Sequence, residues 1–249
     1  MVDRGISHAH FSRMGPKLTR DHALFLDLDG TLLEFAPTAE EVAVPAGLGA
    51  MLRGLAAQRD GALAILSGRS LAQIDAVTAD PFPAGAEHGF VLRDAAGRIH
   101  HPVRQTANRA AWRAALEAAA AAHPGVRIEA KSASLVAHYR ASPEAGPALG
   151  AMIGAMIAEA PEVERLAANM AWEIRPRGAG KGRALEWFMA RPPFAGRVPV
   201  FVGDDVTDEE AIAAAAALGG HGLHVHRDFD GTPAAVLAWL GSALAPGRV

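Results

Sequence analysis

The sequence lacks cysteine, has few aromatic residues and carries little net charge. Its 249 residues include no cysteine, one tyrosine and 6% aromatic residues, and the formal net charge is -3. The absence of cysteine excludes disulfides, iron–sulfur clusters and thiolate catalysis, and it fits a reducing compartment, so we expect a cytoplasmic protein. The small negative charge argues against a nucleic-acid partner, because binding to a phosphate backbone needs clustered cations.

Long hydrophobic runs are also absent. No segment reaches the ~18 uninterrupted apolar residues of a membrane span, since the Ala-rich stretches carry charges such as Arg113 and Glu117. Residues 1–20 are polar and basic, without the apolar segment of a secretory signal, and we expect a flexible tail there. Half of the residues are hydrophobic and 20% are charged, a composition typical of globular proteins that excludes wholesale disorder.

Short apolar runs without alternation predict strands that are buried on both faces of a sheet. These runs are Ala23–Asp27, Ala62–Leu66, Val198–Val202 and, more weakly, Gly222–Val225. Helical segments are expected at Ala46–Arg59, Ser70–Val77, Gly182–Ala190, Asp208–Leu218 and Pro233–Leu244. Strands that alternate with helices over short connections indicate an α/β fold with a doubly wound parallel sheet.

The middle of the chain has a different pattern. Two Ala-rich helical segments accompany three segments of alternating polarity, and these indicate an α+β unit with antiparallel strands. The helices are Asn108–Ala122 and Gly146–Ala160, and the alternating segments are Val126–Ala130, Ser134–Arg140 and Arg165–Arg175. We therefore expect a catalytic core made of residues 21–97 and 179–249, with residues 98–178 inserted as an α/β cap.

Polar residues follow three of the predicted core strands. The first strand leads into Asp27-Leu28-Asp29-Gly30-Thr31, the second into Ser67-Gly68-Arg69 and the third into Gly203-Asp204-Asp205. Lys181 lies in a glycine-rich segment that opens a predicted helix. Ligands of open α/β sheets bind at the carboxyl ends of the strands, so these residues are expected to share one site.

These residue types suit phosphoryl transfer at Mg²⁺, a hard cation that prefers oxygen ligands. Asp27 and Asp204 can supply two carboxylates for the ion, and Asp27 can also attack phosphorus to form an acyl phosphate. Lys181 can lower the charge repulsion, and Ser67 can hold a phosphate oxygen. Asp29 can protonate the leaving oxygen and then accept a proton from water, for which it must be protonated in the first half-reaction.

Each motif taken singly has a structural alternative. Asp27-Leu28-Asp29 can be a turn with a helix N-cap, Ser67-Gly68 can be a turn, and Gly203-Asp204-Asp205 can belong to a capping box. A phosphate-binding loop around Lys181 is not supported, because the positions that need glycine and Ser/Thr hold other residues. The motifs in this order, each at a strand end or helix start, favour one common site.

Three histidines, His221, His224 and His226, offer another metal site. With no cysteine in the chain and no acidic third ligand nearby, a transition-metal site is not favoured. We interpret these histidines as surface residues at a sheet edge.

Together the motifs resemble those of the haloacid dehalogenase superfamily of aspartyl-phosphate phosphatases. Asp27-x-Asp29-Gly30-Thr31 is similar to its first motif, and Ser67, Lys181 and Asp204-Asp205 are similar to the second, third and fourth. The position of the inserted unit is similar to that in the sugar-phosphatase branch. The resemblance implies Mg²⁺ held by Asp27, the backbone carbonyl of Asp29, and Asp204. We also expect Asp205 among the metal residues, and whether Asp205 or Asp208 contacts the metal, directly or through water, stays open.

Within that branch the sequence resembles the trehalose-6-phosphate phosphatase family. The similar segments are Ser67–Arg69, Ala86–Gly89, Glu129–Lys131, His138–Arg140, Trp172–Pro176 and Gly203–Glu209. The resemblance implies hydrolysis of the small-molecule sugar phosphate trehalose 6-phosphate. The sequence does not give the oligomeric state, and a monomer is the default expectation. The resemblance also implies substrate binding by Glu129, Lys131, Arg140 and Glu173 of the inserted unit. We further expect Gly68, Arg69 and His88 to bind substrate, and the alternative for His88 is a turn cap. Charged cap residues can fix sugar hydroxyls, and Glu129 and Lys131 lie near a predicted hairpin tip.

Other functions fit parts of the pattern. A related sugar phosphatase acting on a sucrose or mannosylglycerate phosphate has the same motifs, and a phosphomutase returns the phosphoryl group to a sugar. A receiver domain also phosphorylates an aspartate at a strand end, but it needs neither Asp29 nor an inserted cap. We therefore expect an Mg²⁺-dependent sugar phosphatase whose cap opens and closes about Gly97 and Gly178–Gly182.

Overall fold

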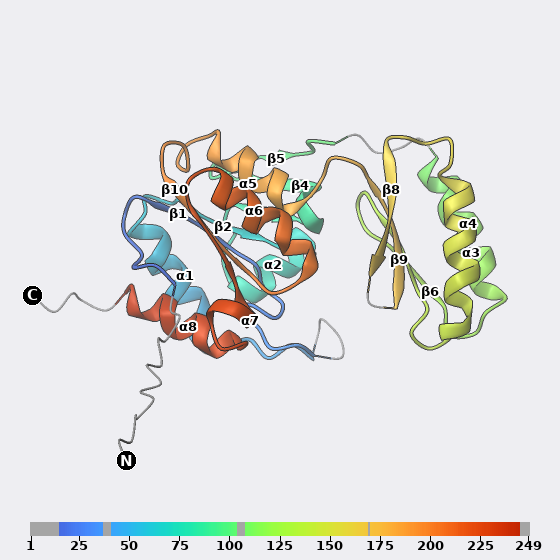
Figure 1. Cartoon of the computed structure of the whole chain (residues 1–249), viewed down its shortest axis with the longest axis horizontal. Coiled ribbons are helices and arrows are strands. Elements are labelled where there is room, and N and C mark those ends of the chain that lie inside the picture. Colours follow the sequence, from blue (N-terminus) through green and yellow to red (C-terminus); the bar gives the residue numbers. More distant parts are fainter. Residues whose placement is uncertain (1–14, 37–40, 104–107, 169, 245–249) are drawn as a thin grey trace, which may run out of the picture.

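The computed structural model describes residues 15–36, 41–103, 108–168 and 170–244, which form a larger and a smaller lobe (Figure 1). Residues 1–14 of the expected flexible tail lie outside the described residues. The rest of that segment contacts the larger lobe: the Trp239 indole N–H donates to the Pro16 carbonyl at 3.1 Å, and Arg20 forms an ion pair with Asp60 at 2.9 Å.

The larger lobe is built on a seven-stranded sheet with the strand order β11-β10-β1-β2-β3-β4-β5. Its strands are β1 (His22–Leu26), β2 (Leu63–Leu66), β3 (Ala84–Ala86), β4 (Val91–Arg93), β5 (Ile99–His100), β10 (Val198–Gly203) and β11 (His221–His224). The strands from β11 to β3 pair in parallel, whereas β4 pairs antiparallel with both β3 and β5. The α/β fold with a parallel sheet that the sequence predicts is thus confirmed.

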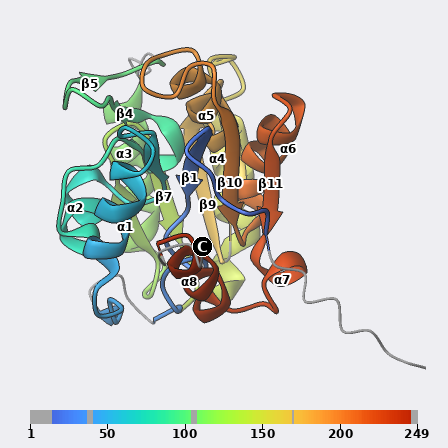
Figure 2. The ribbon, with the colours of Figure 1, turned by 90° about the vertical axis from the view of Figure 1, so that its left-hand side faces the viewer.

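Helices cover both faces of this sheet (Figures 1 and 2). One face carries α1 (Leu48–Ala57), α2 (Leu71–Thr78), α7 (Val225–Asp228) and α8 (Pro233–Ser242), and the other carries α5 (Lys181–Met189) and α6 (Glu209–Ala217). Alternate side chains of β1 enter the two cores: Leu24 and Leu26 face α1, whereas Ala23 and Phe25 face α5. This burial on both faces explains why the strands are continuous apolar runs.

The sequence patterns do not predict β3, β4 and β5 or the single turn of 3-10 helix between β3 and β4, η2 (Glu87–Gly89). These elements have two or three residues each, which is too short for a periodic pattern to identify. The weak run at Gly222–Val225 does form β11, but Val225 already begins α7. Because β5 pairs with β4, the chain leaves the seven-stranded sheet only after His100.

The smaller lobe is a four-stranded antiparallel sheet with two helices on one face. Its elements are α3 (Arg109–Ala121), β6 (Arg127–Ala130), β7 (Leu135–His138), α4 (Gly146–Met156), β8 (Val163–Ala168) and β9 (Ala171–Pro176), and the strand order is β6-β7-β9-β8. Trp112 and Leu116 of α3 and Ile153 of α4 pack against Leu135 and Ile174 of the sheet. The opposite face of the sheet is turned toward the larger lobe (Figure 1).

One strand prediction in the smaller lobe is wrong. Residues Arg165–Arg175, expected as one segment, form a hairpin of β8 and β9 in which Ala168 pairs with Ala171. The sequence between these strands lacks the Asn-Gly or Asp-Gly pair that identifies a tight hairpin in a sequence.

Within the described residues, each helix is too short or too polar to cross a membrane.

Two glycines with positive φ allow a matched test of the fold. Gly89 (φ 92°) lies where an added Cβ would be 2.6 Å from the Gly180 carbonyl oxygen, whereas Gly97 (φ 79°) has no atom within 4 Å of such a Cβ. We expect Gly97→Ala to lower the free energy of unfolding by about 1 kcal/mol, the usual cost of left-handed backbone. Gly89→Ala should lower it at least twice as much, because a backbone carbonyl cannot easily move away. Urea unfolding measures both losses, and equal losses would contradict this packing.

Candidate active site

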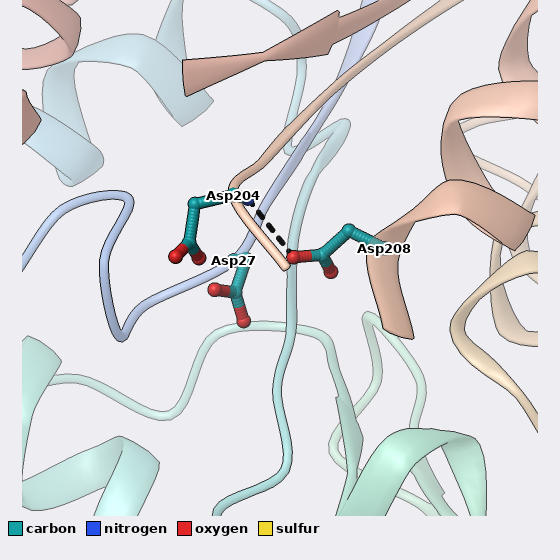
Figure 3. Close-up of side chains that lie close together, drawn as sticks. All are labelled: Asp27, Asp204 and Asp208. Atoms are coloured by element: carbon teal, nitrogen blue, oxygen red, sulfur yellow. Dashed lines mark hydrogen bonds between the residues drawn. The ribbon is translucent and has the colours of Figure 1, made fainter. Parts of the chain in front are cut away.

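The carboxyl ends of β1 and β10 place two aspartates side by side. Asp27 follows β1 and Asp204 follows β10, its parallel neighbour in the sheet. The Thr31 hydroxyl lies 3.3 Å from Asp27 Oδ2 and 3.4 Å from Asp204 Oδ1, so it joins the two side chains. Asp208 completes the cluster, since one oxygen of each carboxylate lies within 4.8 Å of the other two (Figure 3).

Lys181 links two of these carboxylates from the first residue of α5. Its Nζ donates to Asp27 Oδ1 at 2.7 Å and to Asp208 Oδ1 at 2.5 Å, and all three side chains are at least 95% buried. Burial by itself lowers the pKa of Lys181, but the carboxylates of Asp27 and Asp208 outweigh it and hold that pKa above its usual range. The lysine is therefore a fixed positive charge beside Asp27.

Asp208 also shapes the loop that carries Asp204. Its Oδ2 accepts hydrogen bonds from the backbone N–H groups of Asp204 at 3.0 Å and Asp205 at 3.1 Å. The sequence did not distinguish Asp205 from Asp208 as a metal contact. In the structure Asp205 is exposed and its Oδ1 accepts from the Val206 N–H at 2.7 Å, so the geometry places Asp208 in the cluster instead.

The cluster has the donor set and charge that a hard divalent cation needs. Burial raises the pKa of Asp27 to about 8; the Lys181 ammonium opposes this rise and the Asp208 carboxylate adds to it. Burial, Asp208 and Asp205 raise the pKa of Asp204 to about 6. A bound cation favours the ionised form of both groups, and carboxylate oxygens are the ligands that Mg²⁺ prefers.

Gly30 lets the loop backbone approach Asp204. Its φ is 76°, and a Cβ at this position would lie 2.1 Å from Asp204 Oδ2. A residue with a side chain here would push the Asp204 carboxylate away from Asp27. The glycine of the first motif is therefore required by the geometry of the acidic cluster.

Asp29 has a partner that the sequence did not predict. Arg69 Nε donates to Asp29 Oδ2 at 2.8 Å and a terminal nitrogen donates to Oδ1 at 2.7 Å, which is the bidentate geometry of a strong ion pair. Arg69 is 8% exposed, whereas Asp29 is half-buried. Both carboxylate oxygens of Asp29 accept from Arg69, so Asp29 must separate from Arg69 before it can reach a leaving oxygen.

Ser67, Gly68 and His88 lie together beside this pair. Ser67 is fully buried, and its Oγ accepts from the Arg69 N–H at 3.3 Å. A Cβ on Gly68 would lie 2.7 Å from the His88 ring, so the glycine allows the ring to pack on the loop backbone. Burial and the nearby cations, Lys181 first, lower the pKa of His88 to about 3, and the imidazole is neutral near pH 7.

Two adjoining cavities, about 700 Å³ and 1130 Å³, separate the lobes. The first cavity is lined from the larger lobe by Asp29, Gly68 and Arg69, and the second by His88. From the smaller lobe, Glu129 and Lys131 line both cavities, and Arg140 and Glu173 line the second. Glu173 is 5% exposed. The pKa of Glu129 is lowered, mainly by a 2.8 Å hydrogen bond with His138. The structure thus brings the candidate substrate residues of both lobes to one cleft.

The histidines lie elsewhere. His221 and His224 belong to β11, the edge strand of the larger sheet, and His224 Nδ1 accepts from the His226 N–H at 3.2 Å. Among the residues that the structure describes, Asp27, Asp204 and Asp208 are the only group with metal-ligand spacing.

The fold is that of the class of solved structures called haloacid dehalogenase-like hydrolases. A solved haloacid dehalogenase-like hydrolase from B. subtilis aligns with a TM-score of 0.52 at 18% identity, covering 77% of this chain and 86% of that structure. The C-terminal domain of the C. albicans trehalose-6-phosphate phosphatase aligns with a TM-score of 0.71 at 20% identity, covering 92% and 93%. These similarities show the fold.

The sequence comparisons identify the family. The trehalose-phosphatase family profile matches residues 25–232. The trehalose-6-phosphate phosphatase of Escherichia coli (strain K12) is 38% identical over 226 residues, which are 90% of this chain and 83% of the relative. The chain therefore belongs to the trehalose-phosphatase family and is a phosphoric monoester hydrolase.

The neutral state of His88 predicts a pH dependence of stability. Its folded-state pKa of about 3 lies below the unfolded value of about 6.5, so the unfolded chain binds the extra proton as the pH falls below 6.5. We expect this group to remove about 2 kcal/mol of the free energy of unfolding at pH 5 relative to pH 7. Urea unfolding of wild type and His88→Asn measures it, because Asn tolerates the left-handed backbone here (φ 57°). Between pH 7 and pH 5, the free energy of unfolding should fall less in the variant than in wild type. Equal decreases would contradict a buried, neutral His88 imidazole.

Proposed function

We propose that the protein hydrolyses trehalose 6-phosphate to trehalose and phosphate through an aspartyl-phosphate on Asp27. One observation supports this most strongly. Asp27 is buried, held by Lys181 at 2.7 Å and placed beside Asp204, two residues before Asp29, which lines the first cavity between the lobes. The names of the relatives supply the substrate, and the site supplies the chemistry.

Mg²⁺ is the cofactor in this proposal. Asp27, Asp204 and the backbone carbonyl of Asp29 are the groups that would hold it, and Asp208 orients the loop that carries Asp204. When bound, the ion supplies positive charge that offsets the charge of the carboxylates and of the phosphate oxygens. Burial raises the pKa values of Asp27 and Asp204, and the neighbouring carboxylates add to the rise. A buried cluster of carboxylates of this kind is consistent with a cation site.

In the first half-reaction the Asp27 carboxylate attacks phosphorus. Lys181 holds Oδ1 of Asp27 and so fixes the direction in which Oδ2 points. The new bond joins this carboxylate to phosphorus, while the bond from phosphorus to the sugar oxygen breaks and that oxygen takes a proton from Asp29. The Ser67 hydroxyl can donate to a phosphate oxygen, since the backbone N–H groups of Ser67 and Arg69 already have acceptors in the protein.

The ion pair between Arg69 and Asp29 connects substrate binding to proton transfer. A phosphate group is a second anion that fits the Arg69 fork, and it competes with Asp29 for the guanidinium. Binding of substrate therefore releases Asp29 toward the leaving oxygen. In the second half-reaction Asp29 removes a proton from the attacking water, and phosphate leaves Asp27 as a free carboxylate again.

The smaller lobe acts as a cap that selects the sugar. Glu129, Lys131, Arg140 and Glu173 line the cleft opposite the larger lobe, and charged groups hold hydroxyls through charge-assisted hydrogen bonds. A disaccharide presents many hydroxyls, so a wall with charges of both signs suits it. The second cavity is large enough for such a ligand.

Phosphate release from a panel of sugar phosphates tests the substrate and the cofactor. We expect the purified protein to release phosphate from trehalose 6-phosphate faster than from sucrose or mannosylglycerate phosphates. EDTA should abolish the reaction and added Mg²⁺ should restore it. A different preferred sugar would replace the substrate in this proposal, transfer to a sugar without phosphate release would indicate a phosphomutase, and activity in EDTA would contradict the metal site.

A pair of isosteric variants tests the two aspartates. With p-nitrophenyl phosphate, whose leaving group needs no proton, Asp29→Asn should release one equivalent of nitrophenolate in a burst and then turn over about 10²–10⁴-fold more slowly than wild type, the usual contribution of general acid–base catalysis. Asp27→Asn should show no burst, because it lacks the nucleophile. Stopped-flow absorbance measures both. A burst from Asp27→Asn would contradict the nucleophile, and near-normal turnover of Asp29→Asn would contradict the acid/base role.

A further inference from the structure

The turn after β3 has an unusual backbone. Glu87, His88 and Gly89 have φ angles of 49°, 57° and 92° in succession, and left-handed backbone is unfavourable for a residue with a side chain. Two hydrogen bonds hold this turn against the loop that follows β2: the Glu87 N–H donates to the Arg69 carbonyl and the His88 N–H donates to the Ser67 carbonyl, each at 2.9 Å. The strained turn is therefore fixed to the loop that contacts Asp29.

The strained turn directs the Glu87 side chain to the other lobe. Glu87 is 6% exposed, and its Oε2 accepts two hydrogen bonds from Ser132, one from the backbone N–H and one from the hydroxyl, each at 2.8 Å. Ser132 lies in the hairpin tip of the smaller lobe, residues 131–134 between β6 and β7. A carboxylate of the larger lobe thus binds the hairpin tip directly.

The hairpin tip has a defined shape of its own. The Lys131 N–H donates to the Ser134 carbonyl at 3.1 Å, and the Arg109 guanidinium of α3 donates to the carbonyls of Lys131 and Ser134. Because α3, β6 and β7 hold the hairpin tip in this shape, an interaction at Ser132 also orients the neighbouring residues, including Lys131. Lys131 and Glu129 line the same cavity as Glu87, Asp29 and Arg69.

We propose that Glu87 is a positioning residue that docks the smaller lobe over the cleft, so that Lys131 and Glu129 face the sugar while Asp29 and Arg69 face the phosphate. Glu87 touches neither the reacting atoms nor the acidic cluster, and it acts through Ser132. The proposal rests on the proposed function only for the identity of the sugar phosphate. Glu87 and Ser132 both line the first cavity, and water can replace Ser132 as the donor when the lobes separate, so docking is reversible.

A comparison of two substrates tests this role. Trehalose 6-phosphate needs the smaller lobe, whereas p-nitrophenyl phosphate is too small to need its sugar contacts. Glu87→Ala should lower kcat/KM for the sugar phosphate at least tenfold, because it removes two hydrogen bonds to a charged group. It should leave p-nitrophenyl phosphate within about twofold of wild type. Ser132→Ala removes one of the two hydrogen bonds and should have a smaller effect of the same kind.

Two further variants complete the design. Glu87→Gln keeps an acceptor oxygen and should partly restore the sugar-phosphate activity lost in Glu87→Ala. Glu144→Ala removes an exposed acid of the smaller lobe that lies outside both cavities, and it should change neither substrate. An equal loss with both substrates would show that Glu87 only supports the Ser67–Arg69 loop, and no loss with either would show that it has no role; both results overturn the proposal.

A measurement without substrate separates this proposal from the proposed function. The rate of amide hydrogen exchange in residues 130–135 reports on the hydrogen bond that the Ser132 N–H donates to Glu87. We expect Glu87→Ala to speed exchange in this segment about tenfold and Glu144→Ala to leave it unchanged. If the wild type fails to hydrolyse trehalose 6-phosphate, the proposed function fails, and the exchange rates still decide the docking contact. Unchanged exchange in Glu87→Ala would overturn it.

Discussion

The buried Lys181 ammonium between Asp27 and Asp208 is the interaction on which the rest of the site depends. It joins the end of β1, the start of α5 and the loop after β10 through contacts of 2.7 Å and 2.5 Å. Without it two carboxylates would be buried with no cation in direct contact, a situation that costs several kcal/mol. The same contact fixes the direction of the Asp27 carboxylate. Asp208, which Lys181 holds in place, in turn fixes the loop after β10, because its other oxygen accepts hydrogen bonds from the backbone N–H groups of Asp204 and Asp205.

In the proposed reaction, the chemistry and the substrate selection belong to different lobes. The larger lobe provides the acidic cluster, Lys181 and the pair of Arg69 with Asp29, whereas the smaller lobe provides the charged wall of the cleft. Residues from both lobes line each cavity, so the complete site exists only when the lobes face each other. The contact of Glu87 with Ser132 gives this arrangement a specific physical basis in the described residues.

Much of this arrangement follows from the sequence, because parallel strands bring their carboxyl ends together. Asp27, Lys181 and Asp204 are far apart in the chain. Even so, the apolar runs that predict strands, and the polar motifs that follow them or open a helix, place all three in one site. The pairing of Asp29 with Arg69 and of Glu87 with Ser132 has no such signal, since single side chains meet across loops whose paths no periodicity records. The sequence also does not show whether Asp205 or Asp208 joins the acidic cluster, because the turn after β10 decides which of the two side chains points inward. The hairpin of β8 and β9 lacks a turn signature, and β3 to β5 are too short for a pattern.

The central claim is that Asp27 is the phosphoryl acceptor at a cation site shared with Asp204. A crystal structure grown with Mg²⁺ and beryllium fluoride, which mimics a phosphoryl group on a carboxylate, tests it most directly. The account predicts a fluoroberyllate bonded to the Asp27 carboxylate and a cation in contact with both Asp27 and Asp204. A fluoroberyllate on another residue, or a cation that contacts neither aspartate, would contradict it.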